Sequence, residues 1–201
     1  PSGSNLIFAT YIGGSGQETH ETHQLALDTA GSVYVVTATT SLNYPTTTGA
    51  FQRAYGGGNY DFAVSKISSD GSRLLASTYV GGSLGEGPQG IAVDKSGDVY
   101  FAGITSSLDF PVTTPGAFQT TYGGGANDAV LVQLASDFTS LKYATYTGGS
   151  GAEHHRALAL DASGRIYAAG VTDSLDFPAH NAAQSTFGGG PDDAEIAVFG
   201  P

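Results

Sequence analysis

The chain lacks cysteine, methionine and tryptophan, and only 7 of its 201 residues are lysine or arginine. Without cysteine it can form no disulfide and use no thiolate chemistry. Its 18 acidic residues outnumber the basic ones and give a formal net charge of −11. That charge argues against a nucleic acid partner, because phosphate groups are bound mainly by lysine and arginine.

Long apolar runs are also missing. No run approaches the roughly 18 residues of a membrane helix, so we expect no membrane span. The chain has 30 glycines and 8 prolines among many threonines and serines, a composition that fits short strands joined by tight turns. We therefore expect one all-β domain. The lysine-poor, glycine- and threonine-rich composition also favours an extracellular or cell-surface location.

One stretch occurs three times, at residues 28–61, 94–128 and 161–193. Its anchor residues keep step, since Asp28, Asp94 and Asp161 are 66 and then 67 residues apart. A fixed period of this size indicates one supersecondary unit that is stacked several times, with each copy burying its faces on its neighbours.

Each unit is predicted to contain four strands. In the second unit they are expected near residues 89–94, 98–105, 129–135 and 141–147. An Asp-x-x-Gly bend joins the first two, because glycine tolerates positive φ and aspartate bonds to the turn backbone. The long connections between the other strands are expected to emerge on one side, where function would be found.

The two ends of the chain are complementary. Residues 1–14 match the end of a unit at residues 69–82, and the chain stops after the third strand of a unit. This predicts three complete units, at about 15–80, 81–147 and 148–201, the last closed by residues 1–14. Residues 5–12 are then expected to pair with the strand near 194–199, in the same chain or by strand donation to a neighbouring subunit.

Three motifs together resemble the SBBP-type β-propeller repeat of large bacterial and archaeal extracellular proteins. They are Asp-x-x-Gly-x-x-Tyr, the run from Asp109 to Gly125, and the Ser/Ala-Thr-Tyr-x-Gly-Gly-Ser ending. The resemblance implies blades of four antiparallel strands around an axis, the first strand innermost, in a scaffolding or interaction module. The chain departs from the pattern at residues 43–45 and 181–184. A pseudo-threefold prism of three sheets is the alternative architecture.

Propellers have four to eight blades, so three are not expected to close alone. We expect self-association, for example into a six-bladed ring or a filament, or contact with neighbouring domains that extend the arc.

Each glycine triplet is followed three residues later by an aspartate. These aspartates are Asp61, Asp128 and Asp193. They could join loop carbonyls around Ca²⁺, or they could cap loop amides while the glycines let a neighbouring blade approach. Gly81–Gly85 matches G-x-S-x-G by spacing, but a nucleophile elbow requires a following helix, and a loop is expected here.

Histidine and glutamate gather in the connections between units. The candidate metal ligands are His20, His23, His154, His155, Glu18, Glu86 and Glu153. Imidazole and carboxylate at a channel mouth would suit Zn²⁺ or another divalent cation. The alternative is that they are solvated polar residues, because the histidines are not placed equivalently in the three units.

Aromatic residues precede proline in each unit, at Tyr44, Phe110 and Phe177. They could stack on sugars, or they could anchor a long loop on its own blade. Three functions follow: an extracellular non-enzymatic scaffold, a carbohydrate-binding propeller, or a metal-dependent hydrolase or lyase. No complete catalytic constellation is present, which favours the first, and whether the chain is an enzyme stays open.

Overall fold

The computed structural model describes residues 3–18, 24–113 and 115–200. These residues form eleven strands and no helix, so the part of the chain that is described contains no helix able to cross a membrane. The strands make three antiparallel sheets, with the orders β1-β2-β3-β4, β5-β6-β7-β8 and β11-β10-β9. The all-β prediction is therefore confirmed.

Strands that follow one another in sequence are neighbours in every sheet. The first sheet contains β1 (Gln24–Leu27), β2 (Val33–Thr39), β3 (Asp61–Ile67) and β4 (Leu74–Val80). The second contains β5 (Glu86–Val93), β6 (Val99–Thr105), β7 (Asp128–Leu134) and β8 (Leu141–Thr147). The third contains β9 (Glu153–Leu160), β10 (Ile166–Thr172) and β11 (Asp193–Phe199).

The Asp-x-x-Gly bends form as the sequence predicts. Gly31 has a φ of 78° and donates its amide to the carbonyl oxygen of Asp28 at 3.0 Å. The Asp28 carboxylate also accepts from the amides of Ala30 and Ser32. Gly97 and Gly164 repeat this geometry with φ values of 83° and 87°. Glycine is suited to these positions because it tolerates positive φ without strain.

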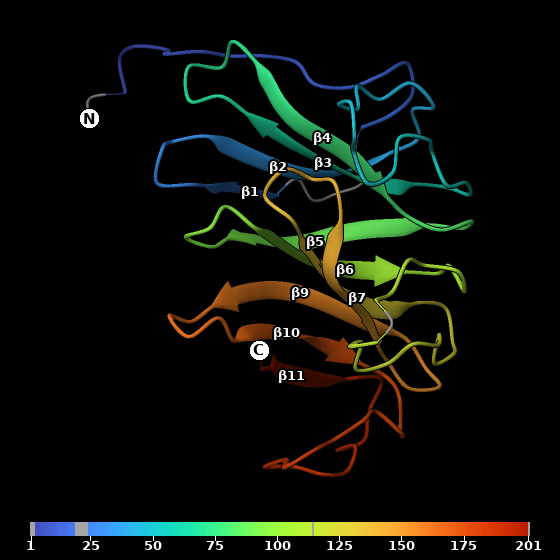
Figure 1. Cartoon of the computed structure of the whole chain (residues 1–201). Helices are drawn as coiled ribbons and strands as arrows, with labels where there is room; N and C mark the ends of the chain where they lie inside the picture. The colour runs from blue at the N-terminus through green and yellow to red at the C-terminus, as the bar shows by residue number, and fades with distance from the viewer. Residues whose placement is uncertain (1–2, 19–23, 114, 201) are drawn as a thin grey trace.

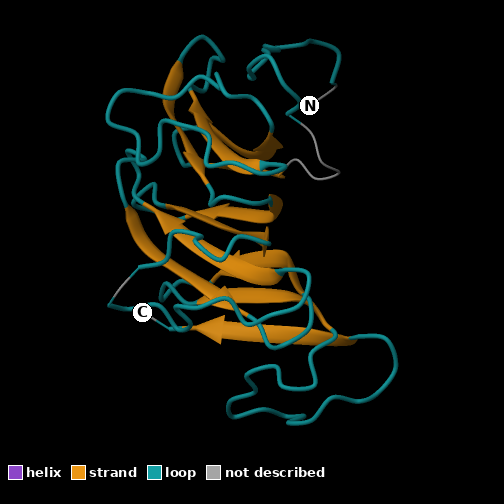
Figure 2. Ribbon diagram, turned by 90° about the vertical axis from the view of Figure 1, so that its right-hand side faces the viewer, coloured by secondary structure: helices purple, strands orange, loops and turns teal. Residues whose placement is uncertain are grey.

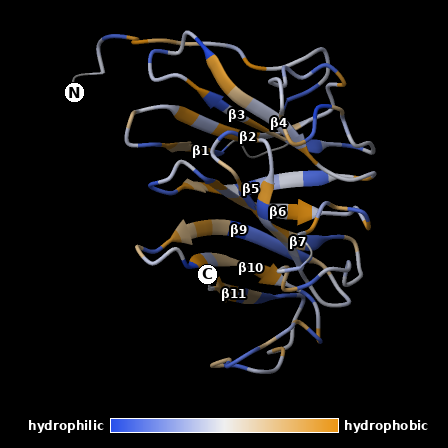
Figure 3. Ribbon diagram, viewed as in Figure 1, coloured by the Kyte–Doolittle hydropathy of each residue, from blue (hydrophilic) through white to orange (hydrophobic). Residues whose placement is uncertain are grey.

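The three sheets are layered face to face (Figures 1 and 2), with β5 against β1 on one side and β9 on the other. Hydrophobic positions recur along the strands of every sheet (Figure 3). The middle sheet has them on both faces, because each of its faces is covered by another sheet. The largest buried cluster joins the first and second sheets and includes Tyr34, Phe62, Phe101 and Val130. A second cluster, with Tyr100, Leu131 and Ile166, joins the second and third sheets.

The N-terminal segment does not complete the third sheet of its own chain. Residues 5–12 form no strand, and they lie at the far end of the stack from β11 (Figure 1). Ile12 packs against the buried Tyr44, Ala63 and Tyr79 on the first sheet. The prediction of pairing with residues 194–199 within one chain is therefore wrong, because two sheets separate the segment from that edge.

Candidate functional site

The loop that leads into each sheet is tied down by a glutamate. Glu86 is buried, and its Oε1 accepts from the hydroxyls of Thr105 and Ser107, both at 2.6 Å. Glu153 accepts from Thr172 at 2.6 Å and from Ser174 in the same way. Equivalent bonds join Glu18 to Thr39 and Ser41. Each predicted glutamate ligand thus connects the entry of a first strand to the end of the second strand.

The aspartate after each glycine triplet accepts from the loop backbone. Asp61 Oδ2 accepts from the Gly56 amide at 2.6 Å, and Asp128 Oδ2 from the Gly123 amide at 2.7 Å. In the third unit Asp193 accepts from the Gly188 amide at 2.6 Å. These bonds favour the capping role over calcium binding, because each of these carboxylates already accepts from loop amides.

The glycine triplets allow two loops to touch. A Cβ on Gly58 would lie 1.5 Å from the carbonyl oxygen of Leu84, and one on Gly125 would lie 2.0 Å from that of Gly151. We call these contacts the first seam (Gly56–Gly58 with Gly81–Leu84) and the second seam (Gly123–Gly125 with Gly148–Gly151). Only glycine permits such an approach of one backbone to another.

Two buried carboxylates meet at the first seam. Asp61 Oδ1 and Glu86 Oε2 both lie 2.7 Å from the point where a Gly81 Cβ would be, so the two oxygens are within 5.4 Å of each other. Neither oxygen has a hydrogen-bond partner among the residues that the structure describes. Burial raises the pKa of Asp61 to about 6 and that of Glu86 to about 7. The pair can therefore hold a proton near neutral pH.

The second seam brings Asp128 and Glu153 together, but there Glu153 Oε2 accepts from the Gly149 amide at 3.0 Å. Both side chains converge on Gly148, and burial raises the pKa of Asp128 to about 6. Within the described residues, no group of three or more His, Asp or Glu side chains could hold a metal ion. The acidic pairs lie in separate seams and form no common centre.

A histidine and a glutamate are buried together in the third sheet. His155 Nδ1 lies 2.7 Å from Glu195 Oε1, and both side chains are almost fully buried. Within the described part of the chain, His155 Nε2 and Glu195 Oε2 have no hydrogen-bond partner. The second unit has Pro88 and Val130 at the equivalent positions. Sequence reasoning missed Glu195; the available signal was a glutamate at a strand position that is apolar in the other two units.

The predicted histidine cluster is only partly described. His20 and His23 lie outside the described residues, so a metal site that includes them stays a prediction. His154 and His155 are successive strand residues and point to opposite faces. His154 Nε2 lies 3.4 Å from the side-chain nitrogen Nδ2 of Asn127, and burial lowers the pKa of His154.

The aromatic residues before proline serve as anchors in the first two units. Tyr44 and Phe110 are each 3% exposed. The Tyr79 hydroxyl accepts from the Tyr44 amide at 2.8 Å, and the Tyr146 hydroxyl accepts from the Phe110 amide at 3.0 Å. Neither buried ring presents a face on which a sugar could stack.

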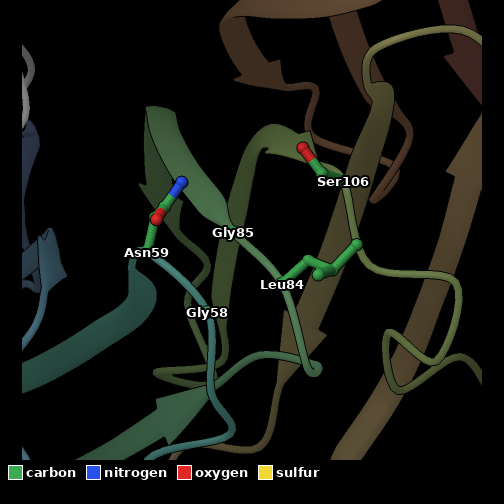
Figure 4. Close-up of a pocket in the computed structure, with 5 residues that line it drawn as sticks. All are labelled: Gly58, Asn59, Leu84, Gly85 and Ser106. Atoms are coloured by element: carbon green, nitrogen blue, oxygen red, sulfur yellow. The ribbon is translucent and has the colours of Figure 1, made fainter.

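A shallow cavity of about 200 Å³ lies beside the first seam, lined by Gly58, Asn59, Leu84, Gly85 and Ser106 (Figure 4). Two of its five lining residues are glycines, and it is smaller than the usual 300–1,000 Å³ of a small-molecule site. At the second seam Asp173 replaces Ser106 and accepts from the Ala152 amide. The cavity therefore carries no functional assignment.

The third sheet exposes the face that the other sheets bury. Ile196 is 77% exposed, whereas the equivalent Val64 and Leu131 are fully buried. Tyr167 and Val198 lie beside Ile196 on the same face and are also exposed. We call this surface, formed by Tyr167, Ile196 and Val198, the open face of the third sheet. At the other end of the stack, Leu25 and Leu27 of the first sheet are exposed as well.

No protein-family model and no curated protein matches this chain.

Proposed function

We propose that this chain is an extracellular, non-enzymatic interaction and assembly module, an arc of a β-propeller whose blades are the three sheets. The open face of the third sheet carries this proposal. The same positions of the first and second sheets are buried by the next sheet in the stack, so the surface that covers them is another sheet of the same kind. The partner is therefore a copy of this chain or a neighbouring domain of the same architecture.

The energetics favour occupation of this face. Burial of one large aliphatic side chain contributes about 1.5–3 kcal/mol, and Ile196 and Val198 lie close together on one sheet. Leu25 and Leu27 at the opposite end of the stack can supply the complementary apolar surface. The two ends of the module thus match each other as adjacent sheets do within the chain.

The other two functions have no comparable support. A sugar platform built on the aromatic residues before proline would need exposed rings, and Tyr44 and Phe110 are buried. A metal-dependent enzyme would need several ligands at one point, and the described residues contain no group of three or more His, Asp or Glu side chains that could hold a metal ion.

Self-association can be measured by light scattering across a range of protein concentrations. We expect a mass that rises above the 20.4 kDa of one chain, and Ile196→Lys should return it to that value. Leu108→Lys is the matched control, because Leu108 is 71% exposed but lies in the loop between β6 and β7 of the middle sheet. A wild-type chain that stays at 20.4 kDa at every concentration would contradict the proposal.

A further inference from the structure

We infer that residues 6–12 of one chain form the missing fourth strand of the third sheet of a second copy. The following loop, Gly13–Gly16, would then dock on Gly188–Gly190 of that copy. The inference rests on the proposed self-association and names the segment that makes the contact. It is carried by three independent comparisons between the N-terminal segment and its equivalents in the chain.

The first comparison concerns one tyrosine. The segments LIFATYIGG, LLASTYVGG and LKYATYTGG place Tyr11, Tyr79 and Tyr146 at the same point. Tyr79 is 0% exposed and Tyr146 is 1% exposed, whereas Tyr11 is 103% exposed. The tyrosine of a motif that forms a buried strand twice is therefore fully exposed in the third occurrence of the motif.

The buried tyrosines fasten a sheet to its long loop. The Tyr146 hydroxyl donates to the carbonyl oxygen of Ser107 at 2.8 Å and accepts from the Phe110 amide. The equivalent acceptor and donor in the third unit are the Ser174 carbonyl and the Phe177 amide. Neither of these groups makes such a bond within the described part of the chain. Tyr11 of a second copy has the right chemistry to supply both bonds.

The second comparison concerns where the segment lies. Ile12 packs on Tyr44, Ala63 and Tyr79 of the first sheet. Val80 of β4 is the residue equivalent to Ile12, and it belongs to a cluster with Phe110, Val130 and Tyr146 of the second unit. These three residues are the equivalents of the three that Ile12 contacts. Residues 6–12 therefore already lie over the first sheet as the outermost strand of a preceding sheet would. They run along that end of the stack in Figure 1, without the three inner strands.

The third comparison concerns the loop. Gly82 of the first seam lies against Ser107 and Asp109, and Gly14 lies against Ser41 and Asn43 in the same way. The loop is therefore formed on its own chain as it is at an internal seam.

What this loop lacks is the glycine triplet of a preceding unit. The atoms nearest to a Cβ on Gly81 belong to Asp61 and Glu86, whereas the three nearest to a Cβ on Gly13 all belong to Glu18. At the C-terminal end, Gly189 and Gly190 also have positive φ values, of 98° and 96°, yet a Cβ on either would meet nothing within 4 Å. The N-terminal loop and the C-terminal triplet are thus the two unmatched halves of one seam.

The pairing register follows from the second sheet. There Ala129 pairs with Thr147, and Val132 pairs with Ala144. Counting from the shared motifs, Ala194 should pair with Ile12 and Ala197 with Ala9 of the second copy. The contact joins different surfaces of the two chains, so repetition closes a ring or extends a filament.

Engineered cysteines can test this register directly, because the chain has no cysteine of its own. Ala9→Cys and Ala197→Cys proteins are mixed and oxidised mildly, and covalent dimers are measured by non-reducing electrophoresis. The control mixture is Ala9→Cys with Ile196→Cys, since Ile196 points to the opposite face of β11. We expect at least tenfold more dimer from the matched mixture. Equal or absent crosslinking in the two mixtures would overturn the inference.

A point variant separates this inference from the proposed function. Tyr11→Ala removes a side chain that is exposed in the single chain, so the chain should fold unchanged and associate at least about tenfold more weakly. Leu108→Ala, in the middle sheet's loop between β6 and β7, is the control and should leave association unchanged. If the wild type associates and Tyr11→Ala associates equally well, strand donation is wrong while the assembly function stands. If the wild type never associates, both are wrong.

Discussion

The N-terminal segment and β8 have nearly the same pattern of residues but different structures. Residues 141–147 form the fourth strand of the second sheet, and the equivalent residues 6–12 form no strand. Both contain the Ala-Thr-Tyr motif, and only β8 has a third strand beside it. The difference shows that strand formation here depends on the partner edge and not on local propensity alone. Variants that change both regions in the same way can test this conclusion.

The largest expected effect comes from the paired tyrosines. Tyr146→Ala removes a buried ring and two hydrogen bonds, and it should lower the free energy of unfolding by about 3–5 kcal/mol. Tyr11→Ala should change it by less than about 0.5 kcal/mol, because Tyr11 is exposed. Urea unfolding of both variants at a protein concentration where the chain is monomeric provides the measurement. Similar losses would show that Tyr11 is buried in the single chain.

The glycine triplets give the next largest difference. Gly58→Ala and Gly190→Ala both place a side chain at positive φ, with values of 65° and 96°. Only the Gly58 Cβ would collide with the carbonyl oxygen of Leu84, so this variant should be less stable than Gly190→Ala by roughly 1–3 kcal/mol. Thermal unfolding of the two variants as monomers measures this difference in stability. Equal stability would mean that the loops of the first seam move apart without cost.

The acidic pair at the first seam predicts an unusual pH dependence. Burial raises the pKa of Glu86 from 4.5 to about 7, so the folded chain keeps a proton that the unfolded chain has released between these pH values. The free energy of unfolding should therefore fall as pH rises from about 4.5 to 7, by on the order of 2 kcal/mol.

Glu86→Gln should make this decline shallower, since glutamine does not ionise. The remaining slope would combine a decline from Asp61 and Asp128, whose pKa values burial raises to about 6, with a rise from His154, whose pKa burial lowers. Chemical unfolding at a series of pH values, for the wild type and the variant, measures both slopes. Stability that rises over this interval would exclude a buried pair that shares a proton.

The strands were predictable from the sequence because turn residues mark their ends. The strand expected at 98–105 is β6, Val99–Thr105, and the one at 129–135 is β7, Asp128–Leu134. The strand expected at 89–94 begins earlier, at Glu86. Gly87 and Pro88 have low strand propensity, yet they pair with Ile104 and Gly103 next to a bulge. Tertiary pairing determined that boundary.

The candidate site was less predictable than the fold. Glu86 and Glu153 were expected in exposed connections, and both are buried at the first position of a strand. The hydroxyls that satisfy them are 19 and 21 residues away in sequence, so no local pattern shows them. The pairing of His155 with Glu195 spans 40 residues and occurs in one unit only. The repeat pattern therefore predicted contacts that the units have in common, but it could not predict the contact between His155 and Glu195, which is specific to the third unit.

The equivalence of the two seams has a consequence for how such a chain can change over generations. A duplicated unit of about 67 residues brings both halves of a seam with it, so insertion between existing units creates no surface without a match. Loss of a whole unit would leave the remaining halves matched for the same reason, whereas a deletion that begins inside a unit would leave one half unmatched. The number of units can therefore drift by recombination while each junction stays under the same selection. Substitutions that suit only one junction, such as the pairing of His155 with Glu195, would mark units that have stopped being interchangeable.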